Sequence, residues 1–122
     1  SSLAIERTPP DWKAAAEALE TFLKRYPAAP DATSVVERLL FVYEESRRYA
    51  DAVPLYERLL RTPEDIPADD VPAVRFRYAR ALEGAGRKDE ARKLYERICA
   101  EAPGTDAAGM ARDRLDAAGK NP

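Results

Sequence analysis

The chain has no histidine, and this absence removes several classes of catalytic and metal site. Without an imidazole it cannot build a Ser-His or Cys-His nucleophile pair, a histidine general base or a histidine-containing zinc site. A phosphate-binding loop, a dinucleotide-binding fingerprint and a zinc-ligand spacing are also missing from the sequence. We therefore expect a protein that is not an enzyme and that needs neither a cofactor nor a metal.

Cysteine is scarce as well, since Cys99 is the only one. No intrachain disulfide can form, so cysteine usage says nothing about the redox compartment. No neighbour of Cys99 in the sequence is an evident activator of its thiol, which favours a structural role on a helix over a reactive one.

The sequence lacks an excess of one charge and lacks long apolar runs. Its 122 residues include 20 basic and 22 acidic ones, for a net charge of −2. Nucleic-acid binders normally carry a basic excess, so nucleic acid is not an expected partner. No apolar run approaches the ~20 residues of a membrane span. The carboxylates Glu64, Asp65, Asp69 and Asp70 lack the spacing of a calcium loop, which favours loop solvation, with Asp70 capping a helix.

What the sequence does contain is a series of segments of helical length, separated by glycine and proline. No segment shows strand alternation, and the length suits one domain at 9–117, with an extension at 1–8 and a tail at 118–122. Thr8, Asp31 and Thr105 are candidate helix caps. Helices are predicted at about 9–26, 32–46, 49–61, 71–84, 88–101 and 105–117.

Two of these helices are copies of one another. Residues 49–59 and 88–98 both place an alanine, a tyrosine and an aliphatic residue at the same offsets. The first helix gives a weaker copy. Its aromatic, alanine, large and aliphatic positions are filled, in this order, by Trp12, Ala15, Leu19 and Phe22. Three copies indicate a helical repeat protein.

These residues resemble the tetratricopeptide repeat, in which a small residue lies where the second helix crosses the first and is followed by an aromatic, an aliphatic and a closing proline. The segment from Arg77 through Ala91 and Tyr95 to Pro103 is the best match. The resemblance implies an all-α fold, a right-handed α-solenoid of antiparallel helix pairs with about six helices. It also implies a half-repeat, two full repeats and a terminal capping helix.

The repeats are longer than the ~34 residues of the standard repeat, which extra loop residues would explain. The alanines are 37 residues apart between Ala15 and Ala52, and 39 between Ala52 and Ala91. Residues 22–27 and 102–108 are similar to the bacterial envelope variety found in the periplasmic Tol-Pal coordinator and in outer-membrane assembly lipoproteins. Related repeats occur in the cytoplasm too, so the localisation stays open.

The resemblance also implies a place for a partner, because the first helix of each pair lines the concave surface of such a stack. An aromatic anchor with neighbouring arginines suits a peptide or a partner helix. Two alternatives remain: Phe41 and Phe76 pack against an adjacent helix, or exposed half-repeat ends mediate self-association into a homo-oligomer or docking to another domain. The residues expected on the concave face are Glu37, Phe41, Glu44, Phe76, Arg80, Glu83 and Arg114.

Overall fold

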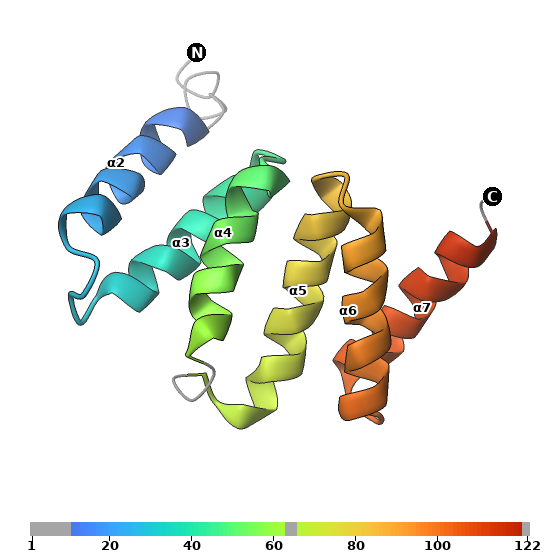
Figure 1. Ribbon diagram of the computed structural model, residues 1–122. Helices are drawn as coiled ribbons and strands as arrows, with labels where there is room; N and C mark the ends of the chain where they lie inside the picture. The colour runs from blue at the N-terminus through green and yellow to red at the C-terminus, as the bar shows by residue number, and fades with distance from the viewer. Residues whose placement is uncertain (1–10, 63–65, 121–122) are drawn as a thin grey trace, which may run out of the picture. The chain divides into compact units, whose positions relative to one another are not determined.

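The structure is a computed structural model that describes residues 11–62 and 66–120 (Figure 1). No strand occurs in these residues, so the all-α prediction is confirmed. Within the residues that the structure describes, a 3-10 turn at Ala68–Asp70 precedes the fourth of six α-helices. The helices are α2 (Trp12–Arg25), α3 (Ala32–Glu45), α4 (Tyr49–Arg61), α5 (Val71–Gly84), α6 (Lys88–Glu101) and α7 (Asp106–Lys120).

The helix bounds follow the prediction closely in the middle of the chain and depart from it at both ends. The bounds of α4, α5 and α6 are those predicted. α2 begins at Trp12 because Asp11 caps it, its carboxylate accepting a hydrogen bond from the Ala14 amide at 3.0 Å. The predicted cap Thr8 therefore does not start this helix, and it lies outside the described residues. α7 continues three residues beyond the predicted end, to Lys120.

Of the other three predicted caps, one makes the expected side-chain hydrogen bond and two do not. Thr105 is confirmed, since its hydroxyl accepts a hydrogen bond from the Ala108 amide at 3.2 Å. Asp31 and Asp70 stand at the starts of α3 and α5 but make no side-chain cap hydrogen bond. Both have backbone angles in the right-handed helical region. A cap residue normally needs an extended backbone for its side chain to reach back to the first turn, so the two predicted positions are confirmed but the two carboxylates do not cap the helices.

The chain divides into two compact units, residues 1–46 and 47–122, so the single domain predicted at 9–117 stays a prediction. In the first unit α2 packs against α3. The register predicted for α2 is wrong by one residue, because Ala16 is fully buried and Ala15 is only partly so. The residues of α2 that match the alanine, tyrosine and aliphatic positions of α6 are thus Ala16, Glu20 and Leu23. Glu20 links α2 to the core through its carboxylate, which accepts a hydrogen bond from the hydroxyl of Tyr43 on α3.

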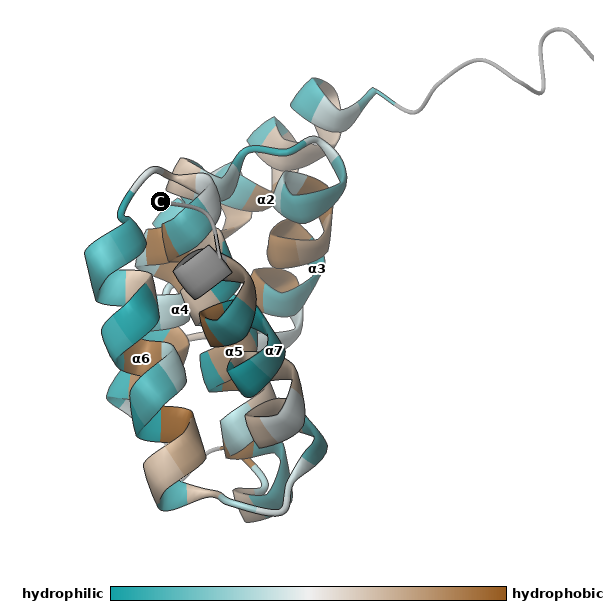
Figure 2. Ribbon diagram, turned by 90° about the vertical axis from the view of Figure 1, so that its right-hand side faces the viewer, coloured by the Kyte–Doolittle hydropathy of each residue, from teal (hydrophilic) through white to brown (hydrophobic). Residues whose placement is uncertain are grey.

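In the second unit α5 packs against both α4 and α6, and α7 packs against α6 and α5 (Figure 1). The small residues Ala79 and Ala91 are buried on α5 and α6, where they let the helices approach closely. Figure 2 shows α6 as mainly hydrophilic, interrupted by a few apolar residues. Its buried side chains are Ala91, Tyr95 and Ile98, so only one side of α6 faces the core.

The turn from α5 to α6 depends on a glycine in the left-handed region. Gly86 has a φ of 87°, and its amide donates to the carbonyl of Glu83 at 3.1 Å. The next amide, that of Arg87, donates to the carbonyl of Leu82 at 2.8 Å. These two hydrogen bonds form a Schellman motif, which ends α5 and reverses the chain into α6. The equivalent residue after α3 is Arg47, which has a φ of 60° without being glycine.

Candidate protein-binding surface

α5 exposes one narrow stripe of residues along its length. Ala73, Arg77, Arg80 and Gly84 are exposed and are spaced by three or four residues, so they lie on one side of the helix. On α3 the residues 39 positions earlier are exposed too, and they form the same pattern in the first unit. These residues are Ser34, Arg38, Phe41 and Glu45. Each of these two first helices therefore carries a stripe of exposed residues along one side.

On α3 this stripe carries an exposed aromatic ring. The side chain of Phe41 is 54% exposed, and its ring meets the edge of Trp12 of α2 at a centroid distance of 6.1 Å. Glu37, one turn before Phe41, is exposed beside the stripe, whereas Glu44 is half-buried. More than half of Phe41 is therefore exposed, and the Trp12 ring packs on part of it.

Phe76 does not lie on the exposed stripe of α5. It is 7% exposed, and its ring contacts that of Tyr95 on α6 at a centroid distance of 5.7 Å. The prediction that Phe76 faces outward is wrong, because the helix places Phe76 one turn before Ala79, and both pack into the core. The spacing of three residues between Phe76 and Ala79 is the signal in the sequence that would have assigned Phe76 to the core.

Glu83 and Arg114 are close together, but they bind each other. Arg114 of α7 donates to the Glu83 carboxylate through Nη2 at 2.6 Å and through Nε at 3.3 Å. The hydroxyl of Tyr95 on α6 donates to the same carboxylate at 2.8 Å. Burial alone would raise the pKa of Glu83, but the hydrogen bonds from Arg114 and Tyr95 lower it below its ordinary value. These three residues join α5, α6 and α7.

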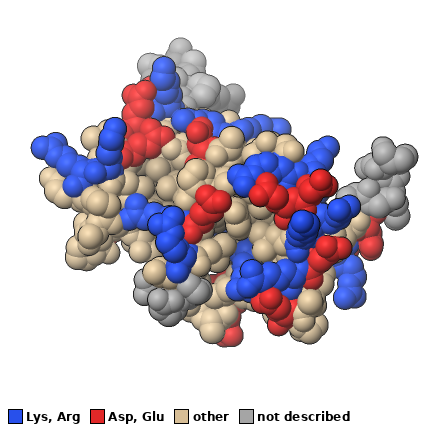
Figure 3. Space-filling model, viewed as in Figure 1, with Lys and Arg blue, Asp and Glu red and all other residues tan. Residues whose placement is uncertain are grey.

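The remaining charged residues of the α5 stripe are two arginines. Arg80 is exposed, and its positive charge also helps to lower the pKa of Glu83. Arg77 is exposed and lies over the ring of Tyr56 on α4, with 5.6 Å between the guanidinium carbon and the ring centroid. Arg80 was predicted from the sequence and Arg77 was not, although Arg77 lies four residues after Ala73 and three before Arg80, which is the spacing of one helix face. Figure 3 shows basic and acidic side chains interspersed over the face in view.

Among the described residues, no group of three or more histidine, cysteine, aspartate or glutamate residues could hold a metal ion. Cys99 is half-buried, and its Sγ lies 3.5 Å from the carbonyl oxygen of Ala108 on α7, which agrees with a structural role. In the same residues, none of the helices combines the length and the apolar character that a membrane span requires.

The tetratricopeptide repeat family matches residues 42–106, which include the whole of α4, α5 and α6. The search of curated proteins returned no match. The match spans more than half of the chain and agrees with the helical repeat seen in the structure, and repeats of this kind generally mediate protein–protein interactions. The chain therefore belongs to the tetratricopeptide repeat family.

Proposed function

We propose that this protein is a non-catalytic scaffold that binds a peptide or a partner helix along the exposed stripes of its first helices. The stripe on α5 offers Arg77 and Arg80, and the stripe on α3 offers Phe41. Aromatic and arginine side chains contribute much of the binding energy in protein interfaces. A protein partner thus suits the chemistry of these surfaces better than a small molecule does.

The observation that carries the proposal is the exposure of Phe41. Phe41 is 54% exposed, and the Trp12 ring that it contacts is only half-buried, so the two rings leave apolar area in water. Covering such area is favourable by about 25 cal/mol per Å². Arg38, three residues before Phe41, is exposed on the same stripe and offers a hydrogen-bond donor next to the apolar contact.

Arg114 and Glu83 have a different role in this proposal. Because they bind each other, they hold α7 against α5 and so fix the surface next to Arg80. Glu37 and Glu44 lie on α3 near Phe41 in the sequence and would set the charge preference of a segment bound there. Phe76 is left out, since it is buried.

Self-association or docking within a larger assembly is the second candidate function. Met110 on α7 is 43% exposed, and an exposed methionine is typical of adaptable contact surfaces. The likeness of residues 22–27 and 102–108 to envelope repeats makes a bacterial envelope assembly one proposed setting for this role, and a cytoplasmic assembly another.

The main proposal is tested by placing a photo-crosslinking amino acid at Phe41 or at Arg80 in cells that make the full protein. We expect discrete crosslinked partners from both positions and none from Arg92, an exposed arginine on α6 that lies outside the stripe. Equal crosslinking from Arg92 would refute the assignment of the surface.

Self-association is tested by measuring the molecular mass in solution. Light scattering over a wide range of protein concentration should show the mass increasing if copies associate. Met110→Glu should then restore a monomer, whereas Phe41→Ala should not. A mass that stays constant at the monomer value excludes the second candidate function and leaves the first one standing.

A further inference from the structure

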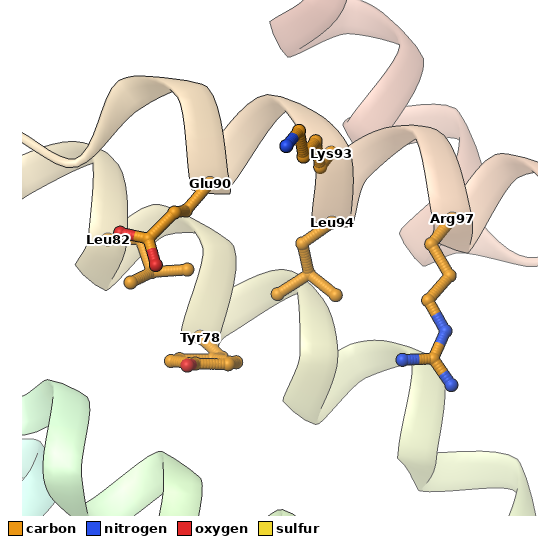
Figure 4. A pocket seen from close by; sticks show the side chains of 6 residues that line it. All are labelled: Tyr78, Leu82, Glu90, Lys93, Leu94 and Arg97. Atoms are coloured by element: carbon orange, nitrogen blue, oxygen red, sulfur yellow. The ribbon is translucent and has the colours of Figure 1, made fainter.

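The other side of α5 carries an open groove that the proposed stripe does not use. Tyr78 is two residues from Arg80, which corresponds to about 200° around a helix with 3.6 residues per turn. Tyr78 and Arg80 therefore face opposite ways. The groove has a volume of about 400 Å³ and is lined by Tyr78 and Leu82 of α5 and by Glu90, Lys93, Leu94 and Arg97 of α6 (Figure 4).

The floor of the groove is apolar and held in place. Leu94 extends from α6 toward α5 between Glu90 and Arg97, as Figure 4 shows. Leu94 and Tyr78 are half-buried, so part of their apolar surface remains in water. The Tyr78 ring packs on Tyr56 at a centroid distance of 6.0 Å, and its hydroxyl donates to Glu57 at 3.2 Å. This floor can cover one or two apolar side chains of a ligand without rearranging.

The two ends of the groove differ in charge. At one end the Glu90 carboxylate is neutralised, because the Arg87 guanidinium donates to it from Nη2 at 2.9 Å. At the other end a single carboxylate, that of Glu101, accepts from Arg97 at 2.7 Å and from Arg75 at 3.0 Å. One negative charge thus serves two arginines, which leaves positive charge at this end.

Lys93 adds to the positive end. It is exposed, and its charge contributes, after the hydrogen bond from Arg87, to lowering the pKa of the Glu90 carboxylate one turn earlier on α6. Lys93 and Arg97 are four residues apart, so they lie on one side of α6 as neighbours. Arg97 uses Nε for its bond to Glu101, which leaves its two terminal amino groups for another carboxylate. An anionic group on a ligand would therefore meet two cations beside an apolar floor.

We propose that this groove is a second protein-binding site, and that it takes a short acidic peptide segment. A bulky apolar side chain of the segment packs on Leu94 and Tyr78, and carboxylates next to that side chain bind Lys93 and Arg97. A basic segment is disfavoured, because it would bring like charges to Lys93 and Arg97. The site lies across α5 from the stripe proposed above and does not depend on it.

A fluorescein-labelled peptide of sequence Asp-Asp-Leu-Phe-Asp-Asp, titrated with the full protein, tests the proposal by fluorescence anisotropy. We expect saturable binding that weakens with added salt. Lys93→Glu should weaken binding by about tenfold or more, since it replaces an attraction by a repulsion. Lys88→Glu is the matched control: Lys88 is an exposed lysine on the same helix outside the groove, and its replacement should change the affinity less than about twofold.

Two further peptides and one further variant give outcomes that overturn the proposal. Lys-Lys-Leu-Phe-Lys-Lys should not bind, because its charge is reversed, and Asp-Asp-Ser-Ser-Asp-Asp should bind at least about tenfold more weakly, because it lacks the apolar contact. Equal binding of either control peptide, or an unchanged affinity in Lys93→Glu, contradicts the assignment. If Arg80→Glu abolishes binding and Lys93→Glu does not, the peptide uses the stripe, which supports the proposed function and refutes the second site.

Discussion

Gly84 tests the packing of the second unit, because a methyl group added there has no room. A Cβ atom built on Gly84 would lie 2.5 Å from Cδ2, 2.6 Å from Cγ and 3.0 Å from Cβ of Tyr49. Carbon atoms normally approach no closer than about 3.5 Å at their optimum. Rotating the Tyr49 ring relieves the first two contacts but not the third, since Cβ is fixed by the backbone of α4.

The expected magnitude follows from two opposing effects. Alanine is favoured over glycine in a helix by about 1 kcal/mol, and the gain at the last residue of α5 is smaller. Overpacking typically costs about 1–3 kcal/mol. We therefore expect Gly84→Ala to lower the free energy of unfolding by about 1–2 kcal/mol, with Tm falling by about 4 °C per kcal/mol in a chain of this size.

Gly109 is the matched control, because it lies inside α7 and a Cβ built on it meets no atom within 4 Å. Gly109→Ala should raise the free energy of unfolding by about 0.5–1 kcal/mol. Chemical denaturation followed by circular dichroism measures both variants. Adding Tyr49→Ala to Gly84→Ala should remove most of the clash, which a double-mutant cycle detects. A stabilising Gly84→Ala would refute the close packing of α4 on α5.

Three other predictions concern stability. Arg47→Gly should stabilise the protein by about 1 kcal/mol in denaturant titrations, because Arg47 occupies the left-handed region that glycine adopts at Gly86; a destabilised variant would contradict this. Pro54→Ala should stabilise it by about 1–2 kcal/mol, since Pro54 lies inside α4 and lacks an amide to donate. Glu83→Gln should cost about 1 kcal/mol at neutral pH, a value reduced for the exposure of the Arg114–Glu83 pair. Because the pKa of Glu83 is lowered in the folded state, its contribution is present above the ordinary carboxyl pKa and is lost as the pH falls through the folded-state value. Wild-type stability should accordingly fall more steeply than that of Glu83→Gln in denaturation series below about pH 5.

The sequence was sufficient to predict the helices of the middle of the chain, because their signals are local. Glycine and proline mark the ends of α4, α5 and α6, and the repeat between residues 49–59 and 88–98 identified the family. The start of α2 was mispredicted because Thr8, which precedes two prolines, and Asp11 both suit a cap position. The preference between two such residues depends on the packing that follows, which the local sequence does not contain.

The candidate surface was harder to predict, because an error of one residue turns a side chain by about 100° on a helix. Phe76 was assigned to the surface and Arg77 was omitted, although the two are adjacent. Glu83 and Arg114 were both expected on the concave face, and their pairing with each other was not predicted. Their pairing depends on how α7 packs against α5, which is a tertiary contact without a local signal.

The position of α5 between α4 and α6 explains why this helix carries both proposed sites. Its neighbours cover Phe76, Ala79 and Leu82, so substitutions there act on stability before they act on binding. Two regions stay accessible: the stripe through Arg80, and the side of Tyr78 that borders the groove. Because these regions face opposite ways, they are suited to two different partner segments. A scaffold built in this way can bind two segments at once, and Arg80→Glu and Lys93→Glu should then impair different partners.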